Sequence, residues 1–490
     1  MLPPMRSLRC AGLPHRHAWT LLLWYIVCLA SLCMMRRQGS TRNVQGENRM
    51  VHQPAEQHVP LQAPPDAPSA KWWQLAFGVL CMAMIANLQY GWTLFVDPID
   101  AQHQWGRTAI QFAFTIFVAT ETWLVPIETW FVDRYGPSIV VGFGGVMIAL
   151  SWTLNAYADS LSLLYAAAVI GGIGAGSVYG TCVGNALKWF PDRRGLAAGA
   201  TAAGFGAGAA ATVVPIAHMI AASGYQKAFL VFGLGQGLVV VLLSFLLRKP
   251  SVAVPIRRKN LRLPQTKIDR SPKEAVRTPV FWTMYAMFVM VASGGLMAAA
   301  QIAPIAHDFK VADVTMNLFG LQMAALTLAI SLDRIFDGFG RPFFGWVSDN
   351  IGRENTMFIA FVIAATACIL LLGYGRNPLV FVLCTAMYFG VFGEIYSLFP
   401  ATCGDTFGSK YAASNAGLLY TAKGTAAFLV PLASVLSASY GWSAVFGLII
   451  GLNILAAALA VFVLKPMRRR YLAAEAEIAD AAEARAVKLA

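Results

Sequence analysis

The sequence predicts an all-α membrane protein with about twelve transmembrane helices in two six-helix halves. Three observations support this prediction. Hydrophobic residues make up 57% of the 490 residues and charged residues only 12%, about half the charged share of an ordinary soluble domain. Apolar runs such as 72–96 exceed the roughly 20 residues needed to cross hydrocarbon, and the mean hydropathy is +0.59. A polar, basic segment near the middle divides these runs into two sets.

Residues 1–71 differ in composition from the rest of the chain. An apolar stretch at 19–35 is short for a span and is flanked by basic residues, and no A-x-A cleavage signal follows it. It could be a signal peptide, an extra span or part of an over-extended gene start. A Pro-rich polar tract after Met50 is typical of disordered sequence. We expect a partly disordered N-terminal extension, with the functional protein beginning near Met50.

The apolar runs after this extension predict the spans in order. Their expected bounds are 73–96, 109–132, 138–157, 162–187, 196–222, 227–248, 280–305, 315–347, 355–374, 378–401, 412–438 and 443–465. The first six form an N-terminal bundle over 72–248, and the last six form a C-terminal bundle over 279–466. A basic linker occupies 249–278, and a tail over 467–490 is expected to form a short helix.

Basic residues between the spans predict the orientation. Most basic residues of the linker lie in its second part: Arg257, Arg258, Lys259, Arg262, Lys267, Arg270, Lys273 and Arg277. The loops near Asp159 and Gly441 contain none. By the positive-inside rule, both termini and the linker face the cytoplasm. The net charge of +13 therefore reflects orientation and does not indicate a nucleic-acid partner.

Two pairs of short segments indicate that the halves are repeats. FVDRYGP, with Asp133 and Arg134, follows the second span, and GWVSDNIGRE, with Asp349, follows the eighth. KWFPDRRGLAAG before the fifth span matches DTFGSKYAASNAG before the eleventh at almost the same offset. Such repeats are typical of secondary transporters, whose substrate site lies near the midplane between the halves.

The second loop contains a complete G-x-x-x-D-x-x-G-R motif at Gly345, Asp349, Gly352 and Arg353. This motif resembles the short cytoplasmic loop signature of the major facilitator superfamily. The first half departs from it at Thr129 and Pro137, a degeneracy that is common in that superfamily.

Two cations lie deep inside predicted spans. Lys423 lies roughly 15–20 Å from the cytoplasmic surface, and Arg341, eight residues before Asp349, lies roughly 12 Å in. Each costs about 2.5–3.5 kcal/mol or more to insert without a partner or water. The functional interpretation is an anion site, with Arg as a planar fork and Lys as a point charge. The alternative is an internal ion pair, for which Asp337 at i−4 is available to Arg341, whereas no acid lies within four residues of Lys423.

Polar aromatic and amide side chains lie at plausible cavity positions, namely Tyr90, Gln89, Tyr179, Tyr396 and Tyr420. A phenol can donate to a carboxylate while its ring shapes the pocket, although such residues more often serve as packing or interface anchors. Intramembrane acids are candidates for proton binding or gating, or for partners of the cations: Glu121, Glu128, Glu394 and Asp337.

Four segments together resemble the oxalate:formate antiporter family of bacterial major facilitator proteins: WFPDRRGLAAGATAAGFGAG, RPFFGWVSDNIGRENTM, YSLFPATCGDTFGSKYAASNAG and YTAKGTAA. The similarity covers about 72–466. It implies that Arg341 and Lys423 bind a dicarboxylate and that Tyr90, Tyr179, Tyr396 and Gln89 line the cavity. The chain departs from the family pattern at five positions, which are Glu121, Glu128, Asp337, Phe392 and Glu394. The added negative charge should weaken dianion binding and favour proton coupling or another carboxylate.

The resemblance implies a secondary transporter in a bacterial inner membrane that takes up oxalate in exchange for formate by alternating access. A proton-coupled monocarboxylate carrier, or a carrier of other small dicarboxylates, is the alternative. A carboxylate receptor is disfavoured because no sizeable soluble domain is present, and an enzyme because no nucleophile–base pair or metal spacing is found. We expect no cofactor or metal, and a monomer.

Overall fold

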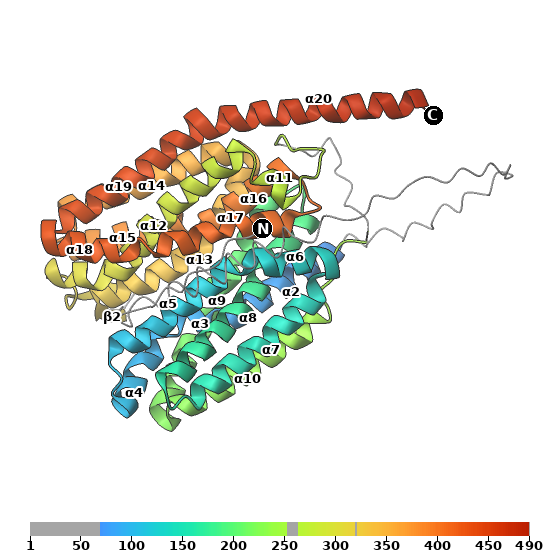
Figure 1. Cartoon of the computed structure of the whole chain (residues 1–490). Coiled ribbons are helices and arrows are strands. Elements are labelled where there is room, and N and C mark those ends of the chain that lie inside the picture. Colours follow the sequence, from blue (N-terminus) through green and yellow to red (C-terminus); the bar gives the residue numbers. More distant parts are fainter. Residues whose placement is uncertain (1–68, 252–262, 319–320, 490) are drawn as a thin grey trace, which may run out of the picture. The chain divides into compact units, whose positions relative to one another are not determined.

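The computed structural model describes residues 69–251, 263–318 and 321–489, and these belong to one compact unit. Figure 1 shows them as a bundle of long helices. Of the predicted N-terminal extension, residues 1–68 lie outside the described part, including the expected start near Met50. The first helix already begins at Ala70.

Nine helices build the N-terminal half. They are α2 (Ala70–Ile85), α3 (Asn87–Tyr90), α4 (Thr93–His103), α5 (Arg107–Trp123), α6 (Val125–Tyr135), α7 (Pro137–Ala156), α8 (Leu161–Trp189), α9 (Arg194–Ser223) and α10 (Tyr225–Ser244). The first predicted span is interrupted at Ala86 and again at Gly91 and Trp92, and so comprises α2, α3 and α4. The second span bends by 42° between α5 and α6, immediately before Pro126, which lacks a backbone donor for the helix.

The linker and the C-terminal half are also mainly helical. Their helices are α11 (Pro272–Ala275), α12 (Pro279–Asp308), α13 (Ala325–Ile351), α14 (Arg353–Tyr374), α15 (Pro378–Phe392), α16 (Ile395–Phe407), α17 (Ala412–Ala427), α18 (Val430–Tyr440), α19 (Trp442–Ala458), the π-helix η2 (Leu459–Leu464) and α20 (Lys465–Leu489). The tenth span consists of α15 and α16, and the eleventh of α17 and α18.

The number of spans agrees with the prediction once one charged helix is included. Ten helical segments of the described residues are long and apolar enough to cross a membrane, and the bent pair α5–α6 makes eleven. Helix α13 is the remaining one. Its 27 residues correspond to roughly 40 Å, and it contains five charged residues, which lower its mean hydropathy.

The predicted start of the eighth span at residue 315 is wrong. Residues 315–324 instead contain a two-stranded antiparallel sheet, in which β1 (Thr315–Leu318) pairs with β2 (Leu321–Ala324), and α13 begins at Ala325. Both the strands and the helix are largely apolar. A short apolar run can form either a strand or a helix. The apolar composition of residues 315–347 therefore predicted one continuous span.

The loop motifs occupy equivalent places in the two halves. Gly136 (φ 91°) ends α6 three residues after Asp133, and Gly352 (φ 103°) ends α13 three residues after Asp349. Both glycines adopt a positive φ that other residues rarely reach. We call the end of the bundle that contains Asp133 and Asp349 the motif end.

The linker and tail contact each other at the motif end. Arg270 of the linker donates to Glu475 of α20 at 2.7 Å, and Lys267 donates to Asp480 at 2.7 Å. Gln265 accepts a hydrogen bond from Arg194 of α9. The expected tail helix is therefore present as part of α20, which is longer than predicted and runs along one side of the bundle (Figure 1).

Candidate functional site between the two halves

Arg341 lies on α13 and is 3% exposed. Its guanidinium donates to Asp337 at 2.7 Å and to the carbonyl oxygen of Ala202 on α9 at 2.9 Å. It also reaches the hydroxyl of Tyr90 at 3.4 Å. Nε has no hydrogen-bond partner among the described residues. Arg341 therefore bridges the two halves and keeps one donor available.

Close helix packing brings Arg341 against the N-terminal half. A side chain on Gly199 of α9 would overlap the backbone carbonyl of Arg341. The glycine-rich stretch at 199–211 thus serves close helix contact, as small residues do in membrane bundles.

Lys423 lies on α17 and is 4% exposed. Its ammonium donates to the hydroxyl of Tyr420 at 2.9 Å and to Glu121 of α5 at 3.2 Å. A longer contact of 3.4 Å reaches the side-chain oxygen of Gln89. Glu121 and Gln89 belong to the N-terminal half, so Lys423 also bridges the halves.

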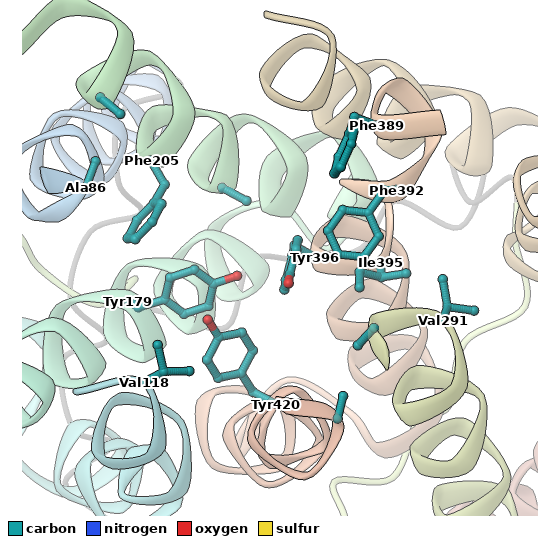
Figure 2. Packing of buried hydrophobic residues seen from close by; sticks show 14 of the residues in the cluster. Ala86, Val118, Tyr179, Phe205, Val291, Phe389, Phe392, Ile395, Tyr396 and Tyr420 are labelled. Atoms are coloured by element: carbon teal, nitrogen blue, oxygen red, sulfur yellow. The ribbon is translucent and has the colours of Figure 1, made fainter. Parts of the chain in front are cut away.

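One tyrosine ring lies beside both cations. The Tyr396 ring centroid is 4.9 Å from Cζ of Arg341 and 5.9 Å from Nζ of Lys423. Tyr179 and Tyr420 stack with centroids 4.4 Å apart (Figure 2). The Tyr179 hydroxyl has no partner among the described residues. The two cations therefore share a tyrosine-lined centre that contains at least one free hydroxyl donor.

Each cation contacts a carboxylate in this structure. The pair that the sequence left open for Arg341, with Asp337 at i−4, is present. Lys423 pairs with Glu121 of the N-terminal half, which lies 302 residues away in sequence. Gln89 and Tyr90 are only partly buried, so the centre is most accessible near these two residues.

Two further candidate acids lie apart from the cations. Glu128 on α6 packs against Gly176 of α8, and Glu394 lies in the break between α15 and α16. Neither carboxyl group has a hydrogen-bond partner among the described residues. An isolated buried carboxylate is costly, so the neutral acid is the form that fits both places.

The sequence interpretation missed Arg334. This residue lies on α13, is exposed, and places its guanidinium 4.8 Å from the Tyr90 ring centroid. It precedes Arg341 by seven residues and so lies on the same helical face. A second arginine seven residues before Arg341 in the same apolar run was the sequence signal that could have identified Arg334 as a candidate. Tyr90 therefore contacts an exposed arginine and a buried one.

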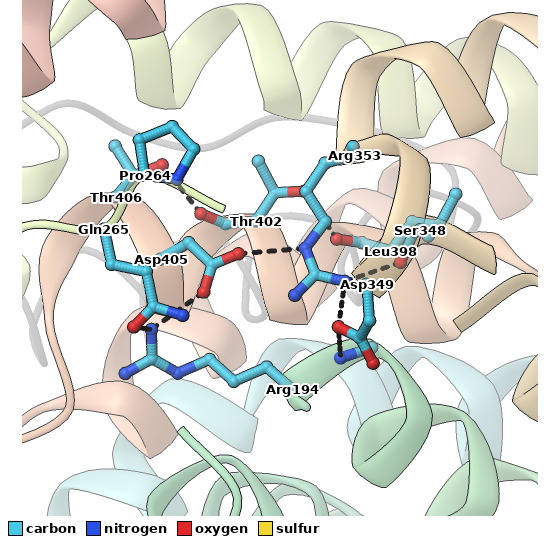
Figure 3. Close-up of polar contacts among 12 residues, drawn as sticks. Arg194, Pro264, Gln265, Ser348, Asp349, Arg353, Leu398, Thr402, Asp405 and Thr406 are labelled. Atoms are coloured by element: carbon cyan, nitrogen blue, oxygen red, sulfur yellow. Dashed lines mark hydrogen bonds and ion pairs between the residues drawn. The ribbon is translucent and has the colours of Figure 1, made fainter. Parts of the chain in front are cut away.

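Buried ion pairs join the halves at the motif end (Figure 3). Asp405 of α16 accepts from Arg194 of α9 at 2.8 Å and from Arg353 of α14 at 2.9 Å. Asp349 pairs with Arg353 at 2.7 Å and accepts from two backbone amides of α9 at 3.1 and 2.9 Å. We call these four charged residues, Arg194, Asp349, Arg353 and Asp405, the latch.

The remaining motif residues flank the latch. Asp133 accepts from Lys188 and from the hydroxyl of Ser414 on α17, both at 2.5 Å. Gly345 packs backbone to backbone against α9. Arg134 lies apart from these contacts, over the rings of Trp130 and Tyr135.

The described chain contains two helical repeats with a cation-containing centre between them and ion pairs that join them at the motif end. This arrangement is typical of a membrane transporter whose substrate site lies between its halves. The sequence matches the Major Facilitator Superfamily model over residues 75–431 and 305–488. It is 35% identical over 401 residues to the oxalate:formate antiporter of Oxalobacter formigenes, covering 81% of this chain and 93% of that protein. The chain belongs to the major facilitator superfamily and, within it, to the oxalate:formate antiporter family.

Solved structures agree on the fold. A proton:xylose symporter superposes with a TM-score of 0.60 at 12% identity, covering 81% of this chain and 96% of that one. A human organic anion transporter superposes with a TM-score of 0.57 at 15% identity, covering 81% and 100%. The protein is thus a transporter and not an enzyme.

We expect Asp405→Asn to destabilise the protein by about 3–5 kcal/mol, because Arg194 and Arg353 would lose a shared, fully buried carboxylate. Thermal unfolding in detergent should show a clear drop in the midpoint. Glu477→Gln, at an exposed position of α20, is the control and should leave the midpoint unchanged. Equal midpoints for both variants would contradict the assigned role of the latch.

Proposed function

We propose that the protein exchanges small carboxylates across a bacterial inner membrane by alternating access, with oxalate uptake and formate export as the leading pair. The observation that carries this proposal is the position of Arg341 and Lys423 beside one tyrosine ring. A small dicarboxylate lying at that ring could contact one cation with each end. The 35% identity to an oxalate:formate antiporter supports the same substrates.

In the proposed cycle, the substrate replaces internal contacts. One carboxylate takes the place of Asp337 beside Arg341, whose planar fork suits a carboxylate. The other takes the place of Glu121 beside Lys423. The free donors, Arg341 Nε and the Tyr179 hydroxyl, then have oxygen atoms to bind. Both cations contact the N-terminal half. Substrate that binds to them therefore changes the contacts that join the halves.

The transport cycle also requires the latch to open. We place the motif end in the cytoplasm on the positive-inside rule, so the latch closes the cytoplasmic side while the opposite side receives substrate. Opening toward the cytoplasm then requires the Arg194–Asp405 pair to separate. Exchange of a dianion for a monoanion moves net charge, so the membrane potential contributes about 2.3 kcal/mol per charge per 100 mV.

A proton-coupled monocarboxylate carrier is the second candidate. The observation that favours it is the set of buried acids in the bundle. Glu121 and Asp337 pair with the cations, and Glu128 and Glu394 have no hydrogen-bond partner in the described part of the chain. Uptake that collapses with a protonophore and does not depend on internal formate would support this candidate over exchange.

We expect Lys423→Ala to abolish labelled oxalate uptake into formate-loaded proteoliposomes, because the site would lose one of its two buried cations. Lys227→Ala, which removes an exposed lysine of α10, is the matched control and should transport normally. Size-exclusion profiles should be alike for both variants. Normal uptake by the Lys423 variant would remove this residue from the site.

Arg334→Gln should raise the apparent KM for oxalate several-fold and leave the maximal rate nearly unchanged. Arg334 is exposed beside Tyr90, where it can attract an anion before the anion reaches Arg341. Arg376→Gln, at an exposed arginine after α14, controls for the loss of a surface charge. Raising the ionic strength should reduce the difference between wild type and Arg334→Gln. A lower maximal rate with unaltered KM would argue against this role.

A further inference from the structure

Both central cations are paired with carboxylates of the chain itself. Arg341, Asp337, Lys423 and Glu121 are 3, 4, 4 and 0% exposed, and they form two ion pairs of 2.7 and 3.2 Å. We propose that Glu121 and Asp337 are internal counter-ions that occupy the cations in the empty carrier, so that the empty carrier can reorient and net transport occurs alongside exchange. This inference rests on the proposed function.

The physical reason is the cost of enclosing charge. A carrier that changes its accessible side must pass through a state in which its centre is closed on both sides. Two unpaired cations in that state would be buried without water, which strongly opposes closure. Bound anionic substrate would remove this cost, and a carrier of that kind would reorient only when loaded. Here the paired acids remove the cost without substrate.

The structure itself has a charge-balanced centre of this kind. Two positive and two negative side chains meet there, and all four are nearly inaccessible. Arg334 is exposed against the Tyr90 ring, and Asp333, next to it on α13, is a further buried acid. Glu128 and Glu394 contact neither cation and have no hydrogen-bond partner among the described residues.

The two pairs differ in how they respond to reorientation. Arg341 and Asp337 are one turn apart on α13, so this pair moves with its helix and can persist on both sides of the cycle. Lys423 and Glu121 lie on α17 and α5, in opposite halves, so this pair closes the centre as the halves meet. Tyr420 lies between them, because its hydroxyl accepts from Lys423 at 2.9 Å and donates to Glu121 at 3.5 Å. When substrate displaces Glu121, Tyr420 can keep a hydrogen bond to the released carboxylate.

The test compares exchange with net efflux in one preparation. The full-length chain is reconstituted into proteoliposomes loaded with labelled oxalate or labelled formate, with the membrane potential clamped by potassium and valinomycin. Efflux is measured into buffer containing unlabelled substrate and into buffer containing none. We expect wild type to release label under both conditions. In Glu121→Gln/Asp337→Asn, the ratio of net efflux to exchange should fall by more than about tenfold.

Glu477→Gln, at an exposed acid of α20, is the control and should leave the ratio of net efflux to exchange unaltered. Wild type that exchanges label but shows no net efflux would overturn the inference and leave the proposed function standing. A double variant with the wild-type ratio would also overturn it. Wild type that neither exchanges nor releases either carboxylate would instead contradict the proposed function. If the double variant does not fold, the wild-type ratio and Glu121→Gln alone decide.

Discussion

Arg341 and Lys423 remain charged inside a bilayer-spanning bundle because each contacts a carboxylate and a tyrosine ring. Ionised groups away from water are stable only with such partners. The partners also decide where the helices lie, since Lys423 holds α17 against α5 and Arg341 holds α13 against α9. For Lys423 the charge pair is itself a contact between the halves, whereas Arg341 pairs with Asp337 on its own helix and reaches the other half through the carbonyl oxygen of Ala202.

A second layer of buried charge lies at the motif end and obeys the same constraint. There, Asp405 and Asp349 draw together side chains and backbone amides from both halves. The linker adds to this layer through Gln265, which accepts from Arg194. The protein thus has two charged layers between its halves. The proposed substrate site coincides with the first layer, and the latch forms the second.

Local sequence was sufficient for the features that depend on composition and short spacing. It predicted the approximate span positions, except for the start of the eighth span, and it predicted the repeat and the two intramembrane cations, because charged residues are rare in apolar runs. It offered Glu121 among four candidate acids but could not single it out as the partner of Lys423, since that contact depends on how α5 and α17 pack across the two halves. The helix breaks at Gly91 and Gly393 were also not predicted. A glycine in an apolar run is compatible with both a continuous and a broken helix.

Helix α13 is continuous over its 27 residues, although Pro342 lies within it. Asp337, Arg341, Gly345 and Asp349 follow one another at intervals of four residues, so they lie along one face. This helix therefore contains Arg341, the proposed carboxylate-binding residue, near its middle and the latch residue Asp349 near one end, roughly 12 Å away. A small tilt caused by an anion at Arg341 would displace Asp349 from the amides of α9. Occupancy at the centre would thereby be converted into mechanical release at the membrane surface.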